Sequence, residues 1–296
     1  MSFPDLNPRI VFCGSSVWDL AVNVERQPRP GQKARGKLRW EGPGGHAFNA
    51  ASVAARLGEN VLLLSHAGHD PRGMQLREWA DNTPGLTTMW APLEHTNTSM
   101  VMHLGGGPER TIVSVRENSA DGAPDSASRS ILQGAGWTDL YWYEGQEEWA
   151  LSIASMNGGQ LSAPLEHAQK LTEWGYRLGL VIDSVDSAQR PDTAWLRNNV
   201  DRCVLTAGER GGEWWTPQDG WQYFNVQSVE NPLSTCGAGD AFRAGLIVSL
   251  ESGLELPDAI ERASWCGAQA LSWPGGVPLA DLHYPGQYAL GSVGKA

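Results

Sequence analysis

The sequence predicts an α/β protein in which helices cover both faces of a mainly parallel sheet. Short apolar runs, several of them ending at a glycine or an aspartate, alternate along the chain with longer amphipathic or alanine-rich runs. Strands and helices in alternation favour parallel strand–helix–strand units. The chain has 296 residues, of which 41% are hydrophobic, and this is enough for one large domain or two small ones.

Two predicted hairpins stand apart from this alternation. After a short apolar strand at 9–13, the half-exposed strands 20–24 and 34–40 flank a Pro-Arg-Pro-Gly turn. The alternating runs 98–103 and 110–115 flank a Gly-Gly-Gly-Pro turn in the same way. The second hairpin could pair with the first, which would give a small separate sheet.

The remaining elements belong to the larger sheet and its helices. We expect strands at 61–64, 140–143, 178–182 and 203–205, with a further hairpin formed by 214–215 and 221–224. The expected helices are 47–57, one from about residue 74, 131–136, 164–175, 241–250 and 256–271. The polar stretch 156–162 is assigned to a loop.

Charge and cysteine content exclude several classes of partner. The formal net charge is −11, the pI is near 5.1 and no basic block is present, which argues against nucleic acid and anionic membranes. The four cysteines are scattered without metal-ligand spacing, and the first eight residues do not resemble a signal peptide. We therefore expect free thiols in a cytoplasmic protein. No apolar run is long enough to span a bilayer.

The stretch Ser234-Thr235-Cys236-Gly237-Ala238-Gly239-Asp240 directly precedes the predicted helix at 241–250. A turn of small residues at a helix N-terminus lets backbone N–H groups face an anion. A carboxylate beside such a cradle, here Asp240, is suited to take a proton from a nucleophile that attacks the bound anion. The alternative is an ordinary glycine-rich turn with an acidic residue that the helix dipole favours. Local chemistry leaves both interpretations open.

A second glycine-rich stretch precedes the helix at 47–57. Gly44 and Gly45 would let the backbone approach a ligand closely, and Asn49 lies in the first helical turn, where it could face that ligand. The run 42–47 also resembles a dinucleotide fingerprint, but no acidic residue ends the next strand, so we do not expect such a site.

Two further motif-like stretches do not support a site. The run 31–37 fits most of a phosphate-binding P-loop, but it lacks the Ser or Thr that would bind magnesium. His66, His69 and Asp70 lie close together without a fourth metal ligand nearby, so solvated polar residues are the preferred interpretation.

Six short motifs occur together in one order. They are Gly14 with Asp19; Gly44-Gly45-x-x-x-Asn49-x-Ala51 running into Ala55-Arg56-Leu57-Gly58; Gly68-x-Asp70-x-x-Gly73; Glu109-Arg110-Thr111; Thr206-x-Gly208-x-x-Gly211; and Gly237-Ala238-Gly239-Asp240. In this order the chain resembles the ribokinase-like carbohydrate kinases, also called the PfkB family, over nearly its whole length. The resemblance implies a ribokinase-like αβα sandwich with a mainly parallel central sheet and a small β-sheet lid. We expect a single domain over 1–296, with the lid formed by segments at about 18–43 and 96–116.

The resemblance also implies ATP- and Mg²⁺-dependent phosphorylation of a hydroxyl on a small sugar or sugar derivative. It makes Asp240 the general base and the amides of Gly237, Ala238 and Gly239 the anion hole. The positions that match acceptor-binding residues are Asp19, Gly44, Gly45 and Asn49, and those that match the nucleotide loop are Thr206, Gly208 and Gly211. Arg110 or Arg116 could meet an acidic group of the acceptor or could be solvated on a strand face. Lids in this family often mediate dimerisation, so we expect a homodimer through the lid.

The sequence departs from the family pattern at three places. Ser234 stands where the family usually has an Asp that helps hold a monovalent cation, which argues against cation activation. The sequence has no Asn-x-x-Glu motif, which in the family organises the magnesium–water network, and Glu209 is a possible metal-binding residue in its place. The short separation of Asp183 and Thr206 leaves no room for the usual additional strand and helix, so one such unit should be shortened or absent. Finally, Asp183 is followed by Ser184-Val185, without the Asn and Arg that are common in the family just after that strand.

These departures open two alternatives. The protein could be a ribokinase-fold binding or regulatory protein with little kinase activity, or it could be a nucleoside kinase. The retained Asp240 and the intact Gly-Ala-Gly turn favour catalysis. The Glu109-Arg110-Thr111 motif favours a sugar over a nucleoside as acceptor.

Overall fold

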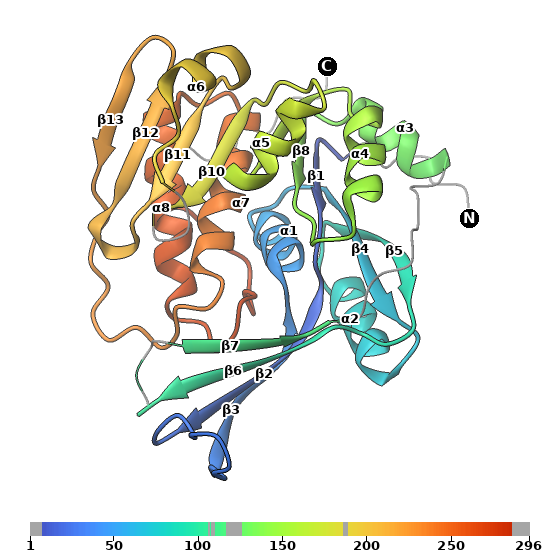
Figure 1. The fold of residues 1–296 in the computed structure, drawn as a ribbon, viewed down its shortest axis with the longest axis vertical. Coiled ribbons are helices and arrows are strands. Elements are labelled where there is room, and N and C mark those ends of the chain that lie inside the picture. Colours follow the sequence, from blue (N-terminus) through green and yellow to red (C-terminus); the bar gives the residue numbers. More distant parts are fainter. Residues whose placement is uncertain (1–7, 106, 108–109, 117–125, 186–188, 286–296) are drawn as a thin grey trace.

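The computed structural model describes residues 8–105, 107, 110–116, 126–185 and 189–285. In this part the chain forms a nine-stranded sheet with helices on both faces and a four-stranded sheet at one edge (Figure 1). The α/β class and the two-sheet architecture predicted from the sequence are confirmed.

The larger sheet has the strand order β13-β12-β11-β10-β9-β8-β1-β4-β5. Its strands from β11 through β5 pair in parallel, whereas β12 and β13 form an antiparallel hairpin on β11. The bounds are β1 Ile10–Cys13, β4 Val61–Gly68, β5 Leu86–Leu93, β8 Trp137–Leu140, β9 Gln160–Ala163, β10 Leu180–Ser184, β11 Cys203–Thr206, β12 Gly212–Thr216 and β13 Gly220–Phe224.

Two apolar clusters hold the helices to this sheet, one on each face. One cluster joins residues of β1, β4 and β10 to four helices: α1 His46–Arg56, α2 Pro71–Asp81, α7 Ala238–Glu251 and α8 Leu256–Ala270. The other cluster joins the opposite side chains of the same strands to α3 Ser126–Gly134, α4 Glu147–Met156, α5 Leu165–Glu173 and α6 Thr193–Asn199. Successive strand residues such as Ile10 and Val11 enter different clusters, as expected for a sheet buried on both faces.

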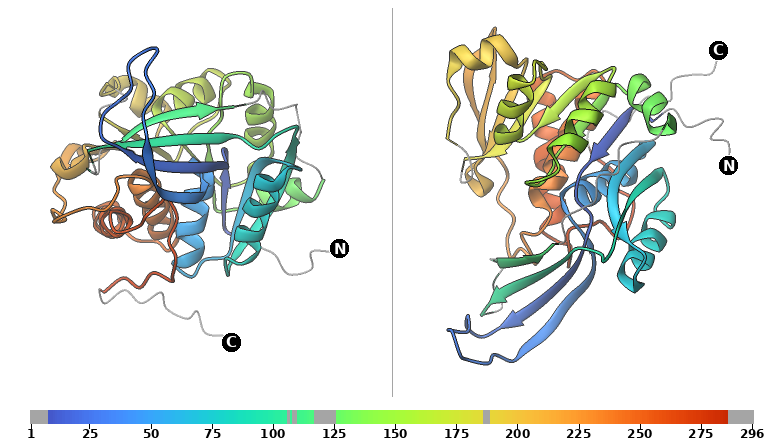
Figure 2. Two further views of the ribbon diagram at one scale, coloured as in Figure 1. Left: turned by 90° about the horizontal axis from the view of Figure 1, so that it is seen from below. Right: turned by 45° about the vertical axis from the view of Figure 1, so that its right-hand side comes forward.

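The smaller sheet has the order β3-β2-β6-β7, with bounds β2 Val17–Val24, β3 Gly36–Gly44, β6 Thr98–Leu104 and β7 Arg110–Val115. The pairs β2–β3 and β6–β7 are antiparallel, and β2 pairs with β6 in parallel, so the two predicted hairpins do join. β2 begins shortly after β1 ends, and β3 runs into α1. These connections place the smaller sheet at the carboxyl edge of the larger one, from which it projects (Figure 2).

Several elements differ from those expected. The strand predicted at 140–143 is β8, which begins and ends three residues earlier. The stretch 156–162, predicted as a loop, contains the end of α4 and most of β9, because its few apolar residues, among them Leu161, are buried in the core. β5, α4 and α6 were not predicted. Within the described residues, no helix is both long enough and apolar enough to cross a bilayer.

The connection between Asp183 and Thr206 agrees with the expected loss of a strand–helix unit. Among its described residues, only the helix α6 lies between β10, which carries Asp183, and β11, which carries Thr206. A strand that was not predicted, β9, lies between β8 and β10 in the sheet.

Candidate active site

The N-terminus of α7 starts at a glycine whose conformation other residues would not adopt easily. Gly237 has φ +75°, and a Cβ atom there would lie 2.6 Å from the carbonyl oxygen of Gly276. The first helical turn therefore begins with Ala238, Gly239 and Asp240, and the N–H groups of such a turn have no partners within the helix. They form the positive end of a helix of 14 residues, which suits an anion.

Ser234 helps to shape the turn before α7. Its side chain is fully buried, and its hydroxyl accepts a hydrogen bond of 3.1 Å from the backbone N–H of Cys236. A neutral hydroxyl satisfies this buried N–H without burying a charge. The structure thus gives the first departure from the family pattern a local structural role.

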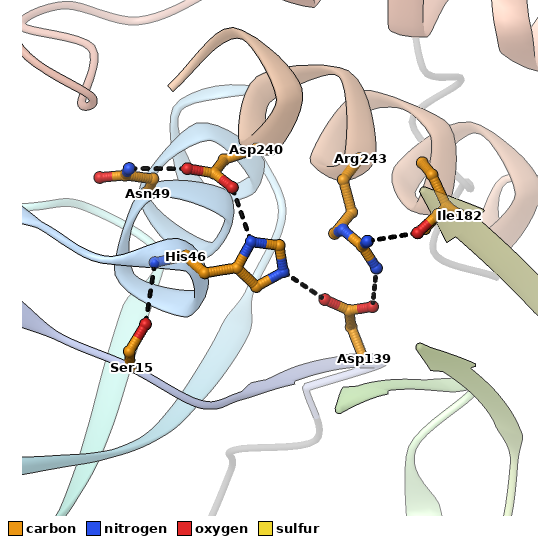
Figure 3. A network of polar contacts seen from close by, with 7 residues as sticks. All are labelled: Ser15, His46, Asn49, Asp139, Ile182, Asp240 and Arg243. Carbon is orange, nitrogen blue, oxygen red and sulfur yellow. Dashed lines mark hydrogen bonds and ion pairs between the residues drawn. The ribbon is translucent and has the colours of Figure 1, made fainter. Parts of the chain in front are cut away.

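The carboxylate of Asp240 is held by two side chains from the first turn of α1. Asn49 Nδ2 donates a hydrogen bond of 2.7 Å to Asp240 Oδ2, and His46 Nδ1 lies 2.7 Å from Asp240 Oδ1 (Figure 3). Because a carboxylate only accepts hydrogen bonds, the proton between these two groups belongs on His46 Nδ1. The start of α1 is itself fixed, since the backbone N–H of His46 donates to Ser15 Oγ at 3.0 Å.

The polar network continues from His46 into the core. His46 Nε2 lies 3.8 Å from Asp139 Oδ2, and Asp139 Oδ1 accepts a hydrogen bond of 2.8 Å from Arg243 Nη1 (Figure 3). Arg243 Nη2 also donates to the carbonyl oxygen of Ile182 at 2.7 Å. Asp139 and Arg243 are both buried, so β8, β10 and α7 meet at an ion pair directly behind the α7 turn.

The two acidic side chains of the site have opposite pKa shifts. Burial acts to raise the pKa of Asp240, but His46, Asn49 and Arg243 outweigh it and hold the pKa below its usual range. Burial raises the pKa of Asp19 to about 7, and the charge of Asp240 adds to this, while a hydrogen bond with Ser99 opposes it. Asp240 is therefore ionised at neutral pH, while Asp19 is poised between its two states.

The predicted acceptor-binding residues come together around Asp19. A Cβ atom at Gly44 would overlap the Asp19 carboxylate, so the glycine makes room for this side chain. Gly45 has φ +97° and leads from β3 into the α1 turn that carries Asn49. Asn49 Oδ1 is buried and has no hydrogen-bond partner within the described part of the chain, so this acceptor remains unsatisfied.

The small sheet reaches the same site through β7. Arg110 Nη1 donates a hydrogen bond of 2.5 Å to Thr235 Oγ1, in the turn before α7. Arg116 lies with its guanidinium carbon 3.6 Å from the centre of the Tyr143 ring, in a cation–π contact. Glu109 of the predicted lid motif lies outside the described residues.

A cavity of about 700 Å³ adjoins His46 on the side away from Asn49. The side chains that line it include Tyr141, His167, Asp183, Glu166 and Arg243. Burial, with the charges of His46 and Arg243, lowers the pKa of His167 to about 4, so this ring is neutral at physiological pH. The cavity opens at the carboxyl ends of β8, β9 and β10, which is where open α/β sheets bind ligands.

The predicted nucleotide loop follows β11. This strand pairs with β10, whose Asp183 lines the cavity. Thr206 ends β11, its Oγ1 donates to the carbonyl oxygen of Asp183 at 3.3 Å, and Gly208 begins a 3₁₀ turn, Gly208–Arg210. Gly211 has φ +82°, and a Cβ atom there would lie 3.0 Å from Asn225 Cα. Glu209 is exposed on this turn and does not line the cavity. Among the described residues, no group of three or more His, Cys, Asp or Glu side chains is arranged to hold a metal ion.

The rejected motifs have structural roles. Asp70 caps α2 by accepting from the N–H of Gly73 at 2.8 Å, and it also binds Thr96. The ring of His66 lies tilted against that of Trp149, with centroids 5.0 Å apart, and burial lowers the pKa of His66 to about 4. The run 31–37 is exposed and covers the end of the connection between β2 and β3 and the first two residues of β3.

The sequence analysis missed three side chains of the site: His46, Asp139 and Arg243. Arg243 had a signal, since a charged residue inside the apolar run 241–250 calls for a buried partner. His46 lies next to Gly45 at a predicted helix start, but nothing in the sequence shows that it reaches Asp240.

A protein-family model matches the two parts of the chain that carry the first turns of α1 and α7. A model of the pfkB family of carbohydrate kinases matches residues 7–138 and 186–280. The segment between these matches supplies Tyr141, His167 and Asp183 to the cavity wall, so the matched ranges do not include this part of the wall.

Two curated relatives and one solved structure are similar to most of the chain. The chain is 35% identical over 258 residues to fructoselysine 6-kinase of Escherichia coli, covering 78% of this chain and 90% of that protein. It is 24% identical over 291 residues to ATP-dependent ribose-1-phosphate kinase of Halopiger xanaduensis, covering 92% and 96%. The structure of Arabidopsis thaliana ribokinase complexed with ribose and ATP superimposes with a TM-score of 0.72 at 16% identity, covering 91% and 94%. The family match extends over more than half of the sequence, and the chain belongs to the pfkB family of carbohydrate kinases.

Proposed function

We propose that this kinase transfers the terminal phosphoryl group of ATP to a hydroxyl of a small sugar or sugar derivative, with Asp240 as general base. One observation carries the proposal: an ionised carboxylate, fixed by His46 and Asn49, lies in the first turn of α7 beside free backbone N–H groups. Such a turn can hold a phosphoryl group while the carboxylate takes the proton of the attacking hydroxyl.

In the proposed reaction the chain contributes positioning and charge. The amides of Gly237, Ala238 and Gly239 bind the transferring phosphoryl group, whose negative charge the helix N-terminus stabilises. Asp240 accepts the proton of the acceptor hydroxyl as its oxygen bonds to phosphorus and the bond to the leaving ADP breaks. Asp19, Gly44, Gly45 and Asn49 orient the acceptor, and Asn49 Oδ1 accepts a hydrogen bond from one of its hydroxyls.

The nucleotide would extend from the α7 turn across the cavity beside His46. Thr206, Gly208 and Gly211 would contact the nucleotide at the far end of this path, because β11, which Thr206 ends, pairs with β10, whose Asp183 lines the cavity. Gly208 and Gly211 both have positive φ, which glycine adopts readily, and without side chains these two residues let a ligand approach the backbone closely.

Magnesium fits the acidic side chains of the cavity better than Glu209. Mg²⁺ usually binds one or two carboxylates together with substrate phosphates and water. Asp183 and Glu166 line the cavity with their carboxylates, and the Asp183 oxygens accept from the N–H groups of Leu165 at 2.9 Å and Ser184 at 2.7 Å. When bound, Mg²⁺ would neutralise charge on the phosphate oxygens. The neutral Ser234 gives no support for a monovalent cation.

A sugar is the acceptor class that the relatives favour. The similar proteins include fructoselysine 6-kinases, ribokinases, a fructokinase, deoxyribokinases and a ribose-1-phosphate kinase. Arg110, which reaches the α7 turn from β7, is the residue best placed to meet an acidic group on such an acceptor.

We further propose that the chain forms a homodimer through its small sheet. The pairing register puts Leu38, Met100, Leu104, Val113 and Val115 on the same face, opposite to Asp19 and Ser99, and these five side chains are 38–66% exposed. An apolar face of this kind on a projecting sheet favours burial against a second copy. Sedimentation at several concentrations should give a dimer for the wild type and a monomer for the Met100→Lys, Val113→Lys double variant.

An assay of ADP release tests the proposed chemistry. Wild-type enzyme and Asp240→Asn are compared on a panel of ribose, deoxyribose, fructose, ribose-1-phosphate, fructoselysine and nucleosides, with ATP and Mg²⁺. We expect turnover on at least one sugar and a loss on the order of 10²–10⁴-fold in Asp240→Asn. Equal background turnover by both proteins on every acceptor would contradict the proposal. Thermal stabilisation by one of these compounds would then indicate a binding protein, and turnover on nucleosides alone would indicate a nucleoside kinase.

A further inference from the structure

We propose that His46 is a positioning residue for Asp240 that fixes the carboxylate and keeps it ionised, and that the buried pair Asp139–Arg243 fixes His46 in turn. This inference rests on the proposed role of Asp240 as general base. It concerns a side chain to which no motif of the sequence gave a role.

The imidazole of His46 has little freedom to leave its position. Its backbone N–H is bound by Ser15 Oγ at 3.0 Å, at the start of α1. Its ring packs against the ring of Tyr141 with centroids 4.8 Å apart, and its Nδ1 lies 2.7 Å from Asp240 Oδ1. These contacts come from three separate segments, so they determine both the place and the plane of the ring.

The other nitrogen of the ring, Nε2, faces a second carboxylate. His46 Nε2 is buried and makes no hydrogen bond to any residue of the described part of the chain. The group that faces it is the carboxylate of Asp139, 3.8 Å away, whose other oxygen is bound by Arg243. The ring therefore lies between two carboxylates, one beside each nitrogen. The contact of 2.7 Å is the one with Asp240, and because a carboxylate only accepts hydrogen bonds, the ring donates there through Nδ1–H.

The hydrogen bond from His46 has a direct consequence for the base. A donor to a carboxylate stabilises its ionised form, and Asp240 has its pKa held low although burial opposes this. Asn49 donates to the other oxygen, so the two donors also fix the rotation of the carboxylate. A base that must meet a hydroxyl within hydrogen-bond reach gains from such fixed geometry.

Other charged or titratable groups face His46 and Asp240 from the elements around them. They are Asp19 on β2, Asp139 on β8, Tyr141 and Tyr143 after β8, His167 on α5, Cys236 before α7, and Arg243 on α7. Of these, Arg243 favours the ionised form of Asp240, and Asp19 opposes it. Loss of His46 leaves the opposing groups in place, so the pKa of Asp240 should rise.

Two replacements of His46 distinguish a positioning role of the side chain from a role in filling space. His46→Phe keeps a ring of similar size and removes both nitrogens, whereas His46→Asn keeps a side-chain N–H near the position of Nδ1. We expect His46→Phe to lose roughly 10- to 100-fold in kcat, with KM for ATP and acceptor within about threefold of the wild type. The acid limb of its kcat/KM profile should move to higher pH, and His46→Asn should recover most of the loss and the wild-type limb. His69→Phe, at an exposed histidine far from this network, is the control and should match the wild type.

A carboxyl ¹³C NMR titration tests the coupling without any turnover. The Asp240 signal is assigned by its absence in Asp240→Asn, and its midpoint should rise in His46→Phe and return toward the wild-type value in His46→Asn. An unchanged midpoint together with an unchanged acid limb in His46→Phe would overturn the proposal, whatever the loss in rate. If His46→Phe does not fold, the same titration in Asp139→Asn, with a smaller rise expected, decides. If the wild type has no turnover on any acceptor, the proposed function fails, while the NMR titration still decides whether His46 controls Asp240.

Discussion

The side-chain amide of Asn49 lies 2.7 Å from the carboxylate of Asp240, although 191 residues separate them in the sequence. Asn49 belongs to the first turn of α1 and Asp240 to the first turn of α7, and the two helices share one apolar cluster. The contact therefore joins the segment proposed to face the acceptor to the segment proposed to face the phosphoryl group. The two halves of the proposed reaction meet at this hydrogen bond.

Replacing Asn49 should weaken both acceptor binding and the chemical step. Asn49→Ala removes one donor to Asp240 and the unpartnered Oδ1, so we expect KM for the acceptor to rise and kcat to fall, with kcat/KM lower by roughly 10- to 100-fold. Steady-state kinetics measure both effects. Ser52→Ala, on the same helix at a buried hydroxyl without a partner in the described structure, is the matched control and should retain wild-type kinetics. A rise in KM alone would mean that the bond to Asp240 does not contribute to the chemical step.

Acceptor binding should release a proton near neutral pH. Burial raises the pKa of Asp19 to about 7, so the free enzyme holds this carboxyl partly protonated, and hydroxyl donors of an acceptor favour the ionised form. Calorimetry at pH 6.5 in buffers of different ionisation enthalpy should show release of a fraction of one proton in the wild type and none in Asp19→Asn. Proton uptake, or equal release by both proteins, would contradict this assignment.

The same group makes stability depend on pH. Its pKa is higher in the folded state, about 7, than the ordinary value of 3.8, so folding favours the protonated form. The stabilising contribution is fully present below about 3.8 and is lost as the pH rises to about 7. Thermal melts of the free protein should therefore show Asp19→Asn to be more stable than the wild type at pH 8, and the difference should shrink as the pH is lowered toward 4.

The two glycines of the α7 turn should respond differently to alanine. Gly237 has a left-handed conformation, and its Cβ would meet Gly276, so Gly237→Ala should lower the free energy of unfolding by at least about 1–3 kcal/mol. Gly239 has no neighbouring atom within 4 Å of a Cβ position, so Gly239→Ala should be close to neutral in stability. It should nevertheless lower turnover, because the added methyl group occupies the space proposed for the phosphoryl group. Urea unfolding measures the effect on stability, and the ADP-release assay measures the effect on turnover. Wild-type turnover by Gly239→Ala would show that the phosphoryl group does not bind at this turn.

Asp139 and Arg243 should behave as a buried ion pair. Removing one partner leaves a charge in the core, so Asp139→Leu or Arg243→Met alone should cost about 3–5 kcal/mol of unfolding free energy. The double variant leaves no unpaired charge and should lose much less than the sum of the two. Urea denaturation of the four proteins gives this cycle. Additive losses would show that the two side chains stabilise the fold independently.

The sequence predicts the fold well where pattern and tertiary packing agree. The alternation of buried strands with α1, α5, α7 and α8, and the two hairpins of the small sheet, follow from periodicity and glycine turns. The prediction failed at 156–162, since one buried leucine in a polar stretch does not distinguish β9 from a loop. The short α6 and the half-buried β5 were missed for the same reason, because a weak local pattern is decided by packing against distant strands.

Only those residues of the site that belong to short sequence motifs could be predicted. Asp240, Asn49 and Gly44 each lie in or directly after a glycine-rich stretch, Asp19 lies in the strand β2 that follows Gly14, and the structure brings the four together. The links from His46 to Asp139 and from Asp139 to Arg243 join residues on α1, β8 and α7, and no local pattern encodes such a contact. The cavity wall between 139 and 185 has no motif at all, since it lies between the two parts that match the family.

The metal dependence of the reaction should follow Asp183 and not Glu209. Asp183 lines the cavity beside His46 and Arg243, whereas Glu209 is exposed on the turn after β11. Asp183→Asn keeps an oxygen that can accept from the N–H of Leu165 but loses the charge that attracts a cation, so the Mg²⁺ concentration for half-maximal turnover should rise roughly tenfold or more. Glu209→Gln is the matched control and should leave this concentration unchanged. Magnesium titrations at saturating ATP and acceptor measure it, with thermal melts to show that Asp183→Asn still folds. If Glu209→Gln shifts the titration and Asp183→Asn does not, the ion binds at the 3₁₀ turn, and the phosphate path must run along β11 instead of across the cavity.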